Sequence, residues 1–306
     1  VTHTLVTTAL DKSALAVLYL VYNLDGTHRK AGEETANNDC DVWEFDFDRE
    51  SPVLPTGHEF PTLICIPTTA GTGAETESTA MITHTDREMK LCVWHMDLKP
   101  SLTLLDPEIT VGLPATFTAW TGIDAMVHAI EAYCVPDFHP MCDGVALEAL
   151  ALISQWLPRA VDEPESIVAR GGMQIGACLG GVSFLKGLGL VHAISHMVGA
   201  EFDTHHGLTN AIVLPAVLRF NAPAISHKLP AMSRALGLKT TDFEAFDAAI
   251  CQMLDRLDIP RSLADIGVPV EAARSIAEKA HQDAAAATNP READVETIER
   301  LVIEAI

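Results

Sequence analysis

The residues best suited to chemistry in this sequence are histidines that cluster in one short segment. His192 and His196 are four residues apart, and His205 and His206 follow within the same 15 residues. A spacing of four places two side chains on one face of a helix. A single histidine among apolar neighbours is usually a core residue, but four so close together favour a site that binds a metal ion.

An aspartate and a histidine form a second pair with the same spacing, at Asp124 and His128. On one helical face they could chelate a divalent cation. An exposed Asp–His pair is common, however, and the spacing alone favours that simpler interpretation. The neighbours Ile123, Met126 and Ile130 are apolar, and a charge buried among them needs a partner. The flanking sequence therefore favours a ligand pair more than the spacing does.

Three histidines with one aspartate form a suitable ligand set for Zn²⁺ or Fe²⁺, and the set does not distinguish the two. The segment does not match the site of a zinc protease. That motif needs a general-base glutamate directly after the first histidine, where this sequence has Ala193. A metallohydrolase needs a general base beside the metal, and we expect no glutamate to be placed for that role.

A segment rich in threonine and glycine, Pro67 to Glu75, follows an apolar run that predicts a strand. The hydroxyls, glycines and backbone N–H groups of such a loop can hold phosphate or ribose oxygens. Loops of this composition are as often simple turns, so the motif by itself leaves both interpretations open. Another segment, Phe184-Leu-Lys186-Gly-Leu-Gly, lies directly before the histidine cluster.

The elements that must position these residues are strands first and helices afterwards. Apolar runs stopped by turn residues predict strands at 62–66, 78–83, 90–94 and 102–105, the first with the profile of a buried strand. Beyond Pro114, segments with few helix breakers predict helices at 116–133, 144–157, 243–257 and 295–305. This order indicates two subdomains, an α/β domain at 1–110 and a helical domain at 111–306.

The bulk composition excludes some classes of partner. The 42 acidic and 20 basic residues give a formal net charge of −22, which repels nucleic acid. No uninterrupted apolar run is long enough to cross a bilayer, and the first residues lack the layout of a secretory signal. The seven cysteines form no CxxC pair and lie mostly in apolar stretches, as reduced thiols do. We therefore expect a cytoplasmic protein without a nucleic-acid or membrane partner.

Taken in order, these motifs resemble the iron-containing (group III) alcohol dehydrogenase family, which is unrelated to the zinc alcohol dehydrogenases. The resemblance extends from about residue 60 to the C-terminus. The matching stretches are Ile66–Gly73, Leu105–Glu108, Thr121–Tyr133, Gly187–His196 and His206–Pro215.

The resemblance implies a fold and a ligand set. The fold is α/β plus all-α, with a truncated Rossmann-like N-terminal domain, an all-helical C-terminal metal-binding domain, and a cleft between them. The metal ligands implied by the resemblance are Asp124, His128, His192 and His206. His205 is excluded because the matching histidine directly precedes a glycine.

The resemblance also implies roles around the metal. His196 lines the cleft as a proton relay or nicotinamide neighbour, Phe184 faces the substrate, and Lys186 marks a variant of the loop that carries them. The residues that match positions in contact with NAD or NADP are Thr68, Thr69, Gly71 and Lys90.

The sequence departs from the family near its start. Members carry a Gly-Gly-Gly-Ser loop for the pyrophosphate, followed by an Asp-x-x-Lys helix. Residues 9–18 are similar to that helix, and the pattern of residues 12–22 predicts a helix. The residues before it, however, are Leu5-Val-Thr-Thr8 instead of the glycine-rich loop. Bulky side chains at the loop hold the backbone away from a phosphate. After it, residues 25–48 are polar and predict a long loop. We therefore expect a shortened and altered nucleotide-binding half.

These features predict a metal-dependent alcohol dehydrogenase that exchanges a hydride between a small alcohol or its aldehyde and NAD(P), acting as a homodimer with Fe²⁺ or Zn²⁺. One alternative is a metal-binding family member with lost or altered redox activity, which NAD(P)H binding would distinguish. Another is an enzyme similar to maleylacetate reductase or to an oxoacid transhydrogenase, which a panel of substrates would distinguish.

Overall fold

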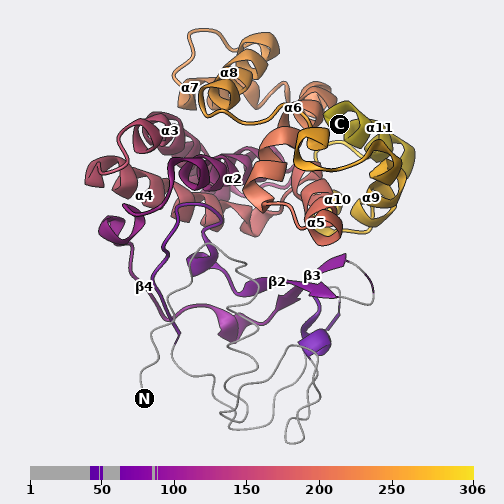
Figure 1. Cartoon of the computed structure of the whole chain (residues 1–306), viewed down its shortest axis with the longest axis horizontal. Coiled ribbons are helices and arrows are strands. Elements are labelled where there is room, and N and C mark those ends of the chain that lie inside the picture. The colour runs from indigo at the N-terminus through magenta and orange to yellow at the C-terminus, as the bar shows by residue number, and fades with distance from the viewer. Residues whose placement is uncertain (1–41, 48, 51–62, 85–86, 88) are drawn as a thin grey trace, which may run out of the picture. The chain divides into compact units, whose positions relative to one another are not determined.

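The computed structural model of the chain describes residues 42–47, 49–50, 63–84, 87 and 89–306 (Figure 1). They fall into two compact units. The first comprises the described residues up to Thr68 together with Ala74–Leu105, and the second comprises Thr69–Gly73 and Asp106–Ile306. The predicted helix at 12–22 and the altered loop at residues 5–8 lie outside the described residues. Only the end of the predicted polar loop at 25–48 is described, and it contains a short 3₁₀ helix, η1 (Val42–Phe45).

The described residues of the first unit contain four short strands, as the sequence predicts. β1 (Ile64–Cys65) pairs in parallel with β4 (Leu102–Thr103), and β2 (Thr79–His84) pairs antiparallel with β3 (Met89–Trp94). Within the described residues these form two separate two-stranded sheets. The prediction of a buried strand at 62–66 was wrong, because 47% of the Ile64 surface is exposed. β1 has one neighbouring strand in the described part of the chain, which leaves much of it uncovered.

The hairpin β2–β3 carries the small core of the first unit. Its register opposes Ala80 to Val93 and Ile82 to Leu91. Ala80, Ile82 and Val93 are buried, as is Phe45 of η1. Short 3₁₀ helices, η2 (Ala74–Thr76) and η3 (Met96–Leu98), flank the hairpin in sequence.

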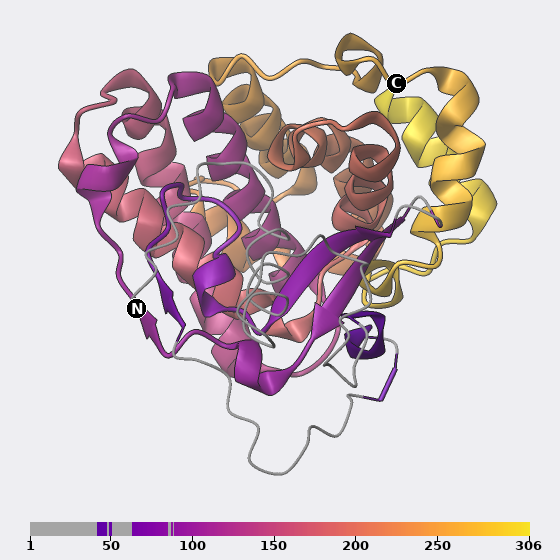
Figure 2. The same ribbon diagram turned by 60° about the horizontal axis from the view of Figure 1, so that its bottom comes forward.

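The second unit is helical. It contains α2 (Ala115–Cys134), α3 (Pro140–Asp162), α4 (Ile167–Ser183), α5 (Leu190–Phe202), α6 (His206–Ile225), α7 (Leu229–Ala235), α8 (Phe243–Arg256), α9 (Ala273–Ala280), α10 (Ala284–Ala287) and α11 (Val295–Ala305). Figures 1 and 2 both show α2, α3 and α4 grouped on one side of this unit and α9 and α11 on the other. α5 and α6 lie between the two groups, where α6 packs against α2.

The predicted helices begin where the sequence supplies a capping side chain or a proline. α2 starts directly after Pro114. At α8, the carboxylate of Asp242 accepts a hydrogen bond from the backbone N–H of Ala245, and Asp294 accepts one from Thr297 at α11. Such a side chain satisfies a backbone donor that has no partner within the helix. The helices predicted at 116–133, 144–157, 243–257 and 295–305 are confirmed as α2, α3, α8 and α11.

α2 lies in the core over most of its length. Ile123, Met126 and Ile130 are each no more than 1% exposed, which confirms the prediction that the neighbours of Asp124 are buried. Asp124 itself is 3% exposed and His128 2%. The Asp–His pair therefore does not lie on a solvated face, and its charge must be compensated inside the protein.

α6 is also a core helix. By length and composition it could cross a membrane, but 67% of the apolar window that meets this test is buried inside the protein.

The six described cysteines are all free thiols, as predicted, and Cys40 lies outside the described residues. Burial raises the pKa of the Cys134 thiol to about 12, so this thiol is neutral and inert.

Candidate metal centre

Three helices bring the predicted ligands together inside the second unit. α2 contributes Asp124, α5 contributes His192 and α6 contributes His206. One potential ligand atom from each lies within 4.8 Å of the other two. Asp124 Oδ1 is 3.5 Å from His206 Nε2 and 3.9 Å from His192 Nε2. The two distances from Asp124 are close to those between ligand atoms that share one cation.

The fourth predicted ligand, His128, lies at the edge of this group. Its Nε2 is 3.9 Å from Asp124 Oδ1. Its ring stacks on that of His192, with centroids 4.5 Å apart, and contacts Phe184 on the other side at 4.9 Å. The structure thus groups three of the four predicted ligands and places the fourth next to them.

A buried glutamate holds His192 in place. Glu131 Oε2 accepts a hydrogen bond from His192 Nδ1 at 2.7 Å, and the carboxylate also accepts from the backbone N–H groups of Val191 and His192. This fixes the proton on Nδ1 and leaves the Nε2 lone pair for a metal. Glu131 is thus a glutamate in contact with a predicted ligand, through the ring nitrogen of His192 that faces away from the cluster. Its oxygens are engaged as acceptors, so it is not the free base that a metallohydrolase needs.

Three further polar groups complete the cluster, and no sequence pattern predicted that they would lie beside the ligands. Thr72 Oγ1 donates to Asp124 Oδ2 at 3.0 Å, which ties the Thr/Gly loop to α2. Ser195 Oγ is 3.3 Å from His206 Nδ1. Asn210, four residues after His206 on α6, donates from Nδ2 to Asp124 Oδ1 at 2.8 Å. That spacing was a usable signal for Asn210, and a second acid within the apolar α2, beside Asp124, was one for Glu131.

His196 points to a different partner. Its Nδ1 lies 2.9 Å from Asp283 Oδ2, and its ring stacks on that of His206 with centroids 5.4 Å apart. Burial raises the pKa of Asp283, but the charge and hydrogen bond of His196 outweigh it and hold the pKa below its ordinary value. Asp283 is therefore an ionised carboxylate that orients the imidazole. No sequence pattern links two residues 87 positions apart.

Lys186 lies in a separate ion pair. Its ammonium is 2.6 Å from Asp143 Oδ1 of α3, and its side chain is 1% exposed. The role of Lys186 toward substrate stays a prediction, and the contact that the structure gives it is a bridge between the loop before α5 and α3.

The predicted cofactor residues are divided between the two units. Thr69 and Gly71 belong to the second unit, whereas Thr68 and Lys90 belong to the first. In the second unit the loop presses closely on its neighbours. A Cβ atom at Gly71 would lie 2.9 Å from Thr121 Cβ, which explains why the smallest residue stands there. Contact of these residues with a dinucleotide stays a prediction.

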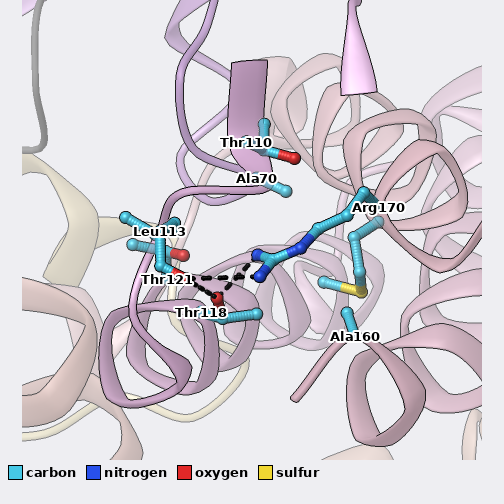
Figure 3. Close-up of a pocket in the computed structure, with 8 residues that line it drawn as sticks. Ala70, Thr110, Leu113, Thr118, Thr121, Ala160 and Arg170 are labelled. Atoms are coloured by element: carbon cyan, nitrogen blue, oxygen red, sulfur yellow. Dashed lines mark hydrogen bonds between the residues drawn. The ribbon is translucent and has the colours of Figure 1, made fainter. Parts of the chain in front are cut away.

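The buried Arg170 is one of the residues that line a small cavity, together with Ala70 of the Thr/Gly loop (Figure 3). The Arg170 guanidinium, 2% exposed, donates to Thr118 Oγ1 at 2.7 Å and to the carbonyl oxygens of Leu113 and Pro164. Burial lowers the pKa of Arg170. None of the lining residues is a predicted ligand, so this group ties α4 to the segment before α2. The lining residues are Ala70, Thr110, Leu113, Thr118, Thr121, Ala160, Arg170 and Met173.

The ligand cluster suits a divalent cation. Asp124 Oδ1 and the Nε2 atoms of His192 and His206 are three acceptors, and all three lie against the Asn210 Nδ2 group, which has two hydrogens to give. Buried acceptors that outnumber their donors are stabilised by a cation. Imidazole and carboxylate are ligands for both iron and zinc.

Comparisons with known proteins agree with this arrangement. The C-terminal model of the Fe-containing alcohol dehydrogenase family matches residues 118–306, and the model of iron-containing alcohol dehydrogenase matches residues 29–107. The chain is 37% identical to "Probable alcohol dehydrogenase EutG" of Escherichia coli over 94% of this chain and 68% of that protein. It is also 37% identical to the NAD-dependent methanol dehydrogenase of Bacillus methanolicus, over 84% of this chain and 68% of that protein.

The fold matches as well. The crystal structure of a 1,3-propanediol oxidoreductase superposes with a TM-score of 0.82 at 30% identity, over 96% of this chain and 73% of that one. The chain belongs to the iron-containing alcohol dehydrogenase family, whose members are metal- and NAD(P)-dependent oxidoreductases. This confirms the family predicted from the motifs. The chain spans between 59% and 71% of the length of four of the curated relatives.

Proposed function

We propose that this chain catalyses reversible hydride transfer between a small alcohol and NAD(P), with a divalent metal held by Asp124, His192 and His206 and flanked by His128. The observation that carries the proposal is the convergence of ligand atoms of Asp124, His192 and His206 within 4.8 Å, from three different helices. The names of the relatives support the substrate class, since they include a methanol dehydrogenase and a 1-propanol dehydrogenase.

The residues around the cluster have separate proposed roles in the reaction. A divalent cation held there supplies Lewis acidity, which makes an alcohol hydroxyl easier to deprotonate. Glu131 keeps His192 in the tautomer that leaves Nε2 available. His196 donates Nδ1–H to Asp283, so its Nε2 is the atom that takes the hydroxyl proton. Phe184, packed on His128, excludes water from the substrate side.

The cofactor half of the proposal extends to the first unit. We propose a truncated Rossmann-like N-terminal domain, and the residues proposed to hold the dinucleotide are Thr68, Thr69, Gly71 and Lys90; NAD(P) bound there would supply the hydride acceptor. The protein's main contribution is to hold alcohol and nicotinamide in line for transfer. We further propose that the chain acts on an alcohol or aldehyde in the cytoplasm, and that it does so as a homodimer. Light scattering on the purified protein tests the dimer.

The decisive experiment couples metal content to turnover. The protein is reconstituted with Fe²⁺ or Zn²⁺, metal is measured by elemental analysis, and NAD(P)H formation is followed with a panel of short alcohols. His206→Ala is expected to lose both metal and turnover. His205→Asn is the matched control: it changes the neighbouring histidine, which is not a ligand, and keeps a side chain able to cap α6. Full activity in a metal-free His206→Ala protein would refute the proposal.

Metal binding without turnover has a defined meaning. It would identify a metal-binding family member whose redox activity is lost or altered. Fluorescence titration with NADH and NADPH then distinguishes loss of cofactor binding from a different substrate. Maleylacetate and oxoacid–hydroxyacid pairs complete the panel.

A further inference from the structure

Asn210 is buried at the centre of the ligand cluster. It lies on α6, four residues after His206, and it is 0% exposed. Its Nδ2 is 2.8 Å from Asp124 Oδ1, 3.2 Å from His192 Nε2 and 3.1 Å from His206 Nε2. A single amide nitrogen therefore touches an atom of each of the three grouped ligands.

The neighbours of the two histidines define which atoms face Asn210 as acceptors. Glu131 takes the proton of His192 Nδ1, so His192 Nε2 carries a lone pair. Ser195 Oγ donates to the backbone oxygen of His192, so it accepts from His206 Nδ1, and His206 Nε2 is likewise a lone pair. With the Asp124 carboxylate this makes three acceptors. They fix Nδ2, and not Oδ1, as the amide atom that faces them.

The other end of the amide is poorly satisfied. Asn210 Oδ1 is buried and has no hydrogen-bond partner within the described part of the chain. Buried amide oxygens in native proteins almost always have a partner. The present orientation therefore combines three acceptors competing for two hydrogens with one buried acceptor that has no donor.

We propose that Asn210 is part of the metal site and that its amide turns over when a divalent cation binds to Asp124, His192 and His206. A cation draws the three lone pairs to itself, and it repels the N–H groups that point at them. Turning the amide by half a turn moves Nδ2 away and places Oδ1, the atom without a partner, toward the positive charge. Amide oxygens are accepted ligands of divalent metals. The proposal rests on the metal site of the proposed function, but its test reads the amide itself and needs no turnover.

The first measurement is nuclear magnetic resonance of the full chain with ¹⁵N-labelled asparagine, metal-free and loaded with diamagnetic Zn²⁺. The Asn210 side-chain signals are assigned by their loss in Asn210→Ser. In the metal-free protein we expect nuclear Overhauser effects from the Asn210 NH₂ group to the ring protons of His192 and His206. On loading to one Zn²⁺ per chain, checked by elemental analysis, these contacts disappear. If they persist in the loaded protein, the amide does not turn and the proposal fails.

The internal control is a pair of other buried side-chain amides. Asn221 and Asn289 hydrogen-bond to each other reciprocally, at 3.0 and 2.9 Å, and neither contacts a ligand. Their side-chain contacts stay the same in both states. A simultaneous change there would indicate a general rearrangement and would count against a local turn of Asn210.

The second measurement is Zn²⁺ affinity by competition with a chromophoric chelator. Asn210→Leu keeps the side-chain shape and removes both polar atoms. If Asn210 turns its oxygen to the cation, this variant binds Zn²⁺ about tenfold more weakly or worse, the size seen when groups that support a metal site are removed. If the amide instead keeps its N–H groups in place and must be displaced, the variant binds more tightly. Unchanged or tighter binding overturns the proposal, and the resonance experiment on the unmodified chain decides if the variant does not fold.

Discussion

Glu131 Oε2 and His192 Nδ1 lie 2.7 Å apart, and the same carboxylate accepts the backbone N–H groups at the start of α5. One side chain of α2 therefore fixes both the position of α5 and the tautomer of a ligand on it. A helix N-terminus also favours a negative charge, because its backbone N–H groups point outward. The same carboxylate thus holds both a proposed metal ligand and the start of α5.

Replacing Glu131 by Gln should weaken metal binding by about 10- to 100-fold. The carboxamide keeps the size of the side chain, but its NH₂ group faces the backbone N–H donors of Val191 and His192 that the carboxylate accepts. Zn²⁺ affinity by chelator competition measures the effect. Glu148→Gln, at an exposed position of α3, is the control and should bind like the original protein. Equal affinities for both variants would show that Glu131 does not orient His192.

Adding one methyl group at Gly207 should disturb the centre through the backbone. A Cβ atom there would lie 2.3 Å from the Trp120 carbonyl oxygen, so α6 must move away from α2 and carry His206 with it. Gly207→Ala is expected to lose about 2 kcal/mol of unfolding free energy, as overpacked core sites do, and to bind less metal. Gly112→Ala adds the same group where nothing lies within 4 Å. That control should match the original protein in urea unfolding and in metal content.

The buried guanidinium of Arg170 should matter more for stability than an exposed one. Arg170→Met leaves Thr118 and the Leu113 and Pro164 carbonyls without their donor, at a cost of about 3 kcal/mol in unfolding free energy. Arg159 forms an exposed ion pair with Glu163, and Arg159→Met should cost less than about 1 kcal/mol. Thermal unfolding of the two variants tests this. Similar melting temperatures would mean that the Arg170 contacts add little.

Glu77 should make the stability of the first unit depend on pH. Burial raises its pKa from 4.5 to about 7, despite opposing hydrogen bonds from Thr76 and Thr79. Between these values the unfolded chain releases the proton while the folded chain keeps it, so stability falls as pH rises from 4.5 and levels off above 7. Relative to Glu77→Gln, the original protein should lose about 3 kcal/mol of unfolding free energy between pH 4 and 8, measured by urea unfolding.

The control for this prediction is an exposed acid. Glu108→Gln should leave the pH dependence of unfolding unchanged, because Glu108 is on the surface. If Glu77→Gln shows the same pH dependence as the original protein, Glu77 does not titrate in this range.

The sequence predicts those parts of the fold that local patterns specify. α8 follows from its apolar spacing and its Asp242 cap, and the β2–β3 strands follow from short apolar runs. α4 shows what such patterns miss, because five of its 17 residues are glycines, which disfavour an isolated helix. They fit because α3 lies close: a Cβ at Gly172 would be 2.4 Å from Trp156. Tertiary packing, not propensity, determines this helix.

The candidate site divides in the same way. The helical spacing of residues such as Asp124 and His128 predicts a ligand pair within one helix. The resemblance to the family adds His206 to the predicted ligands. The supporting contacts join distant positions, from Thr72 to Asp124, 52 residues apart, to His196 and Asp283, 87 residues apart. Only the folded chain brings such pairs together, because spacing within an element carries no information on contacts between elements.

The depth of the ligands sets how fast a metal can be exchanged. The side chains of Asp124 and His192 are 5% and 2% exposed, whereas that of His206 is 27% exposed. An ion that binds all three must shed water, and of the three side chains His206 is the one most accessible from solvent. Exchange is then slow compared with the encounter of ions in solution. We therefore expect a chelator to remove a metal ion from this site more slowly than from a fully exposed one, because two of the three proposed ligands are buried.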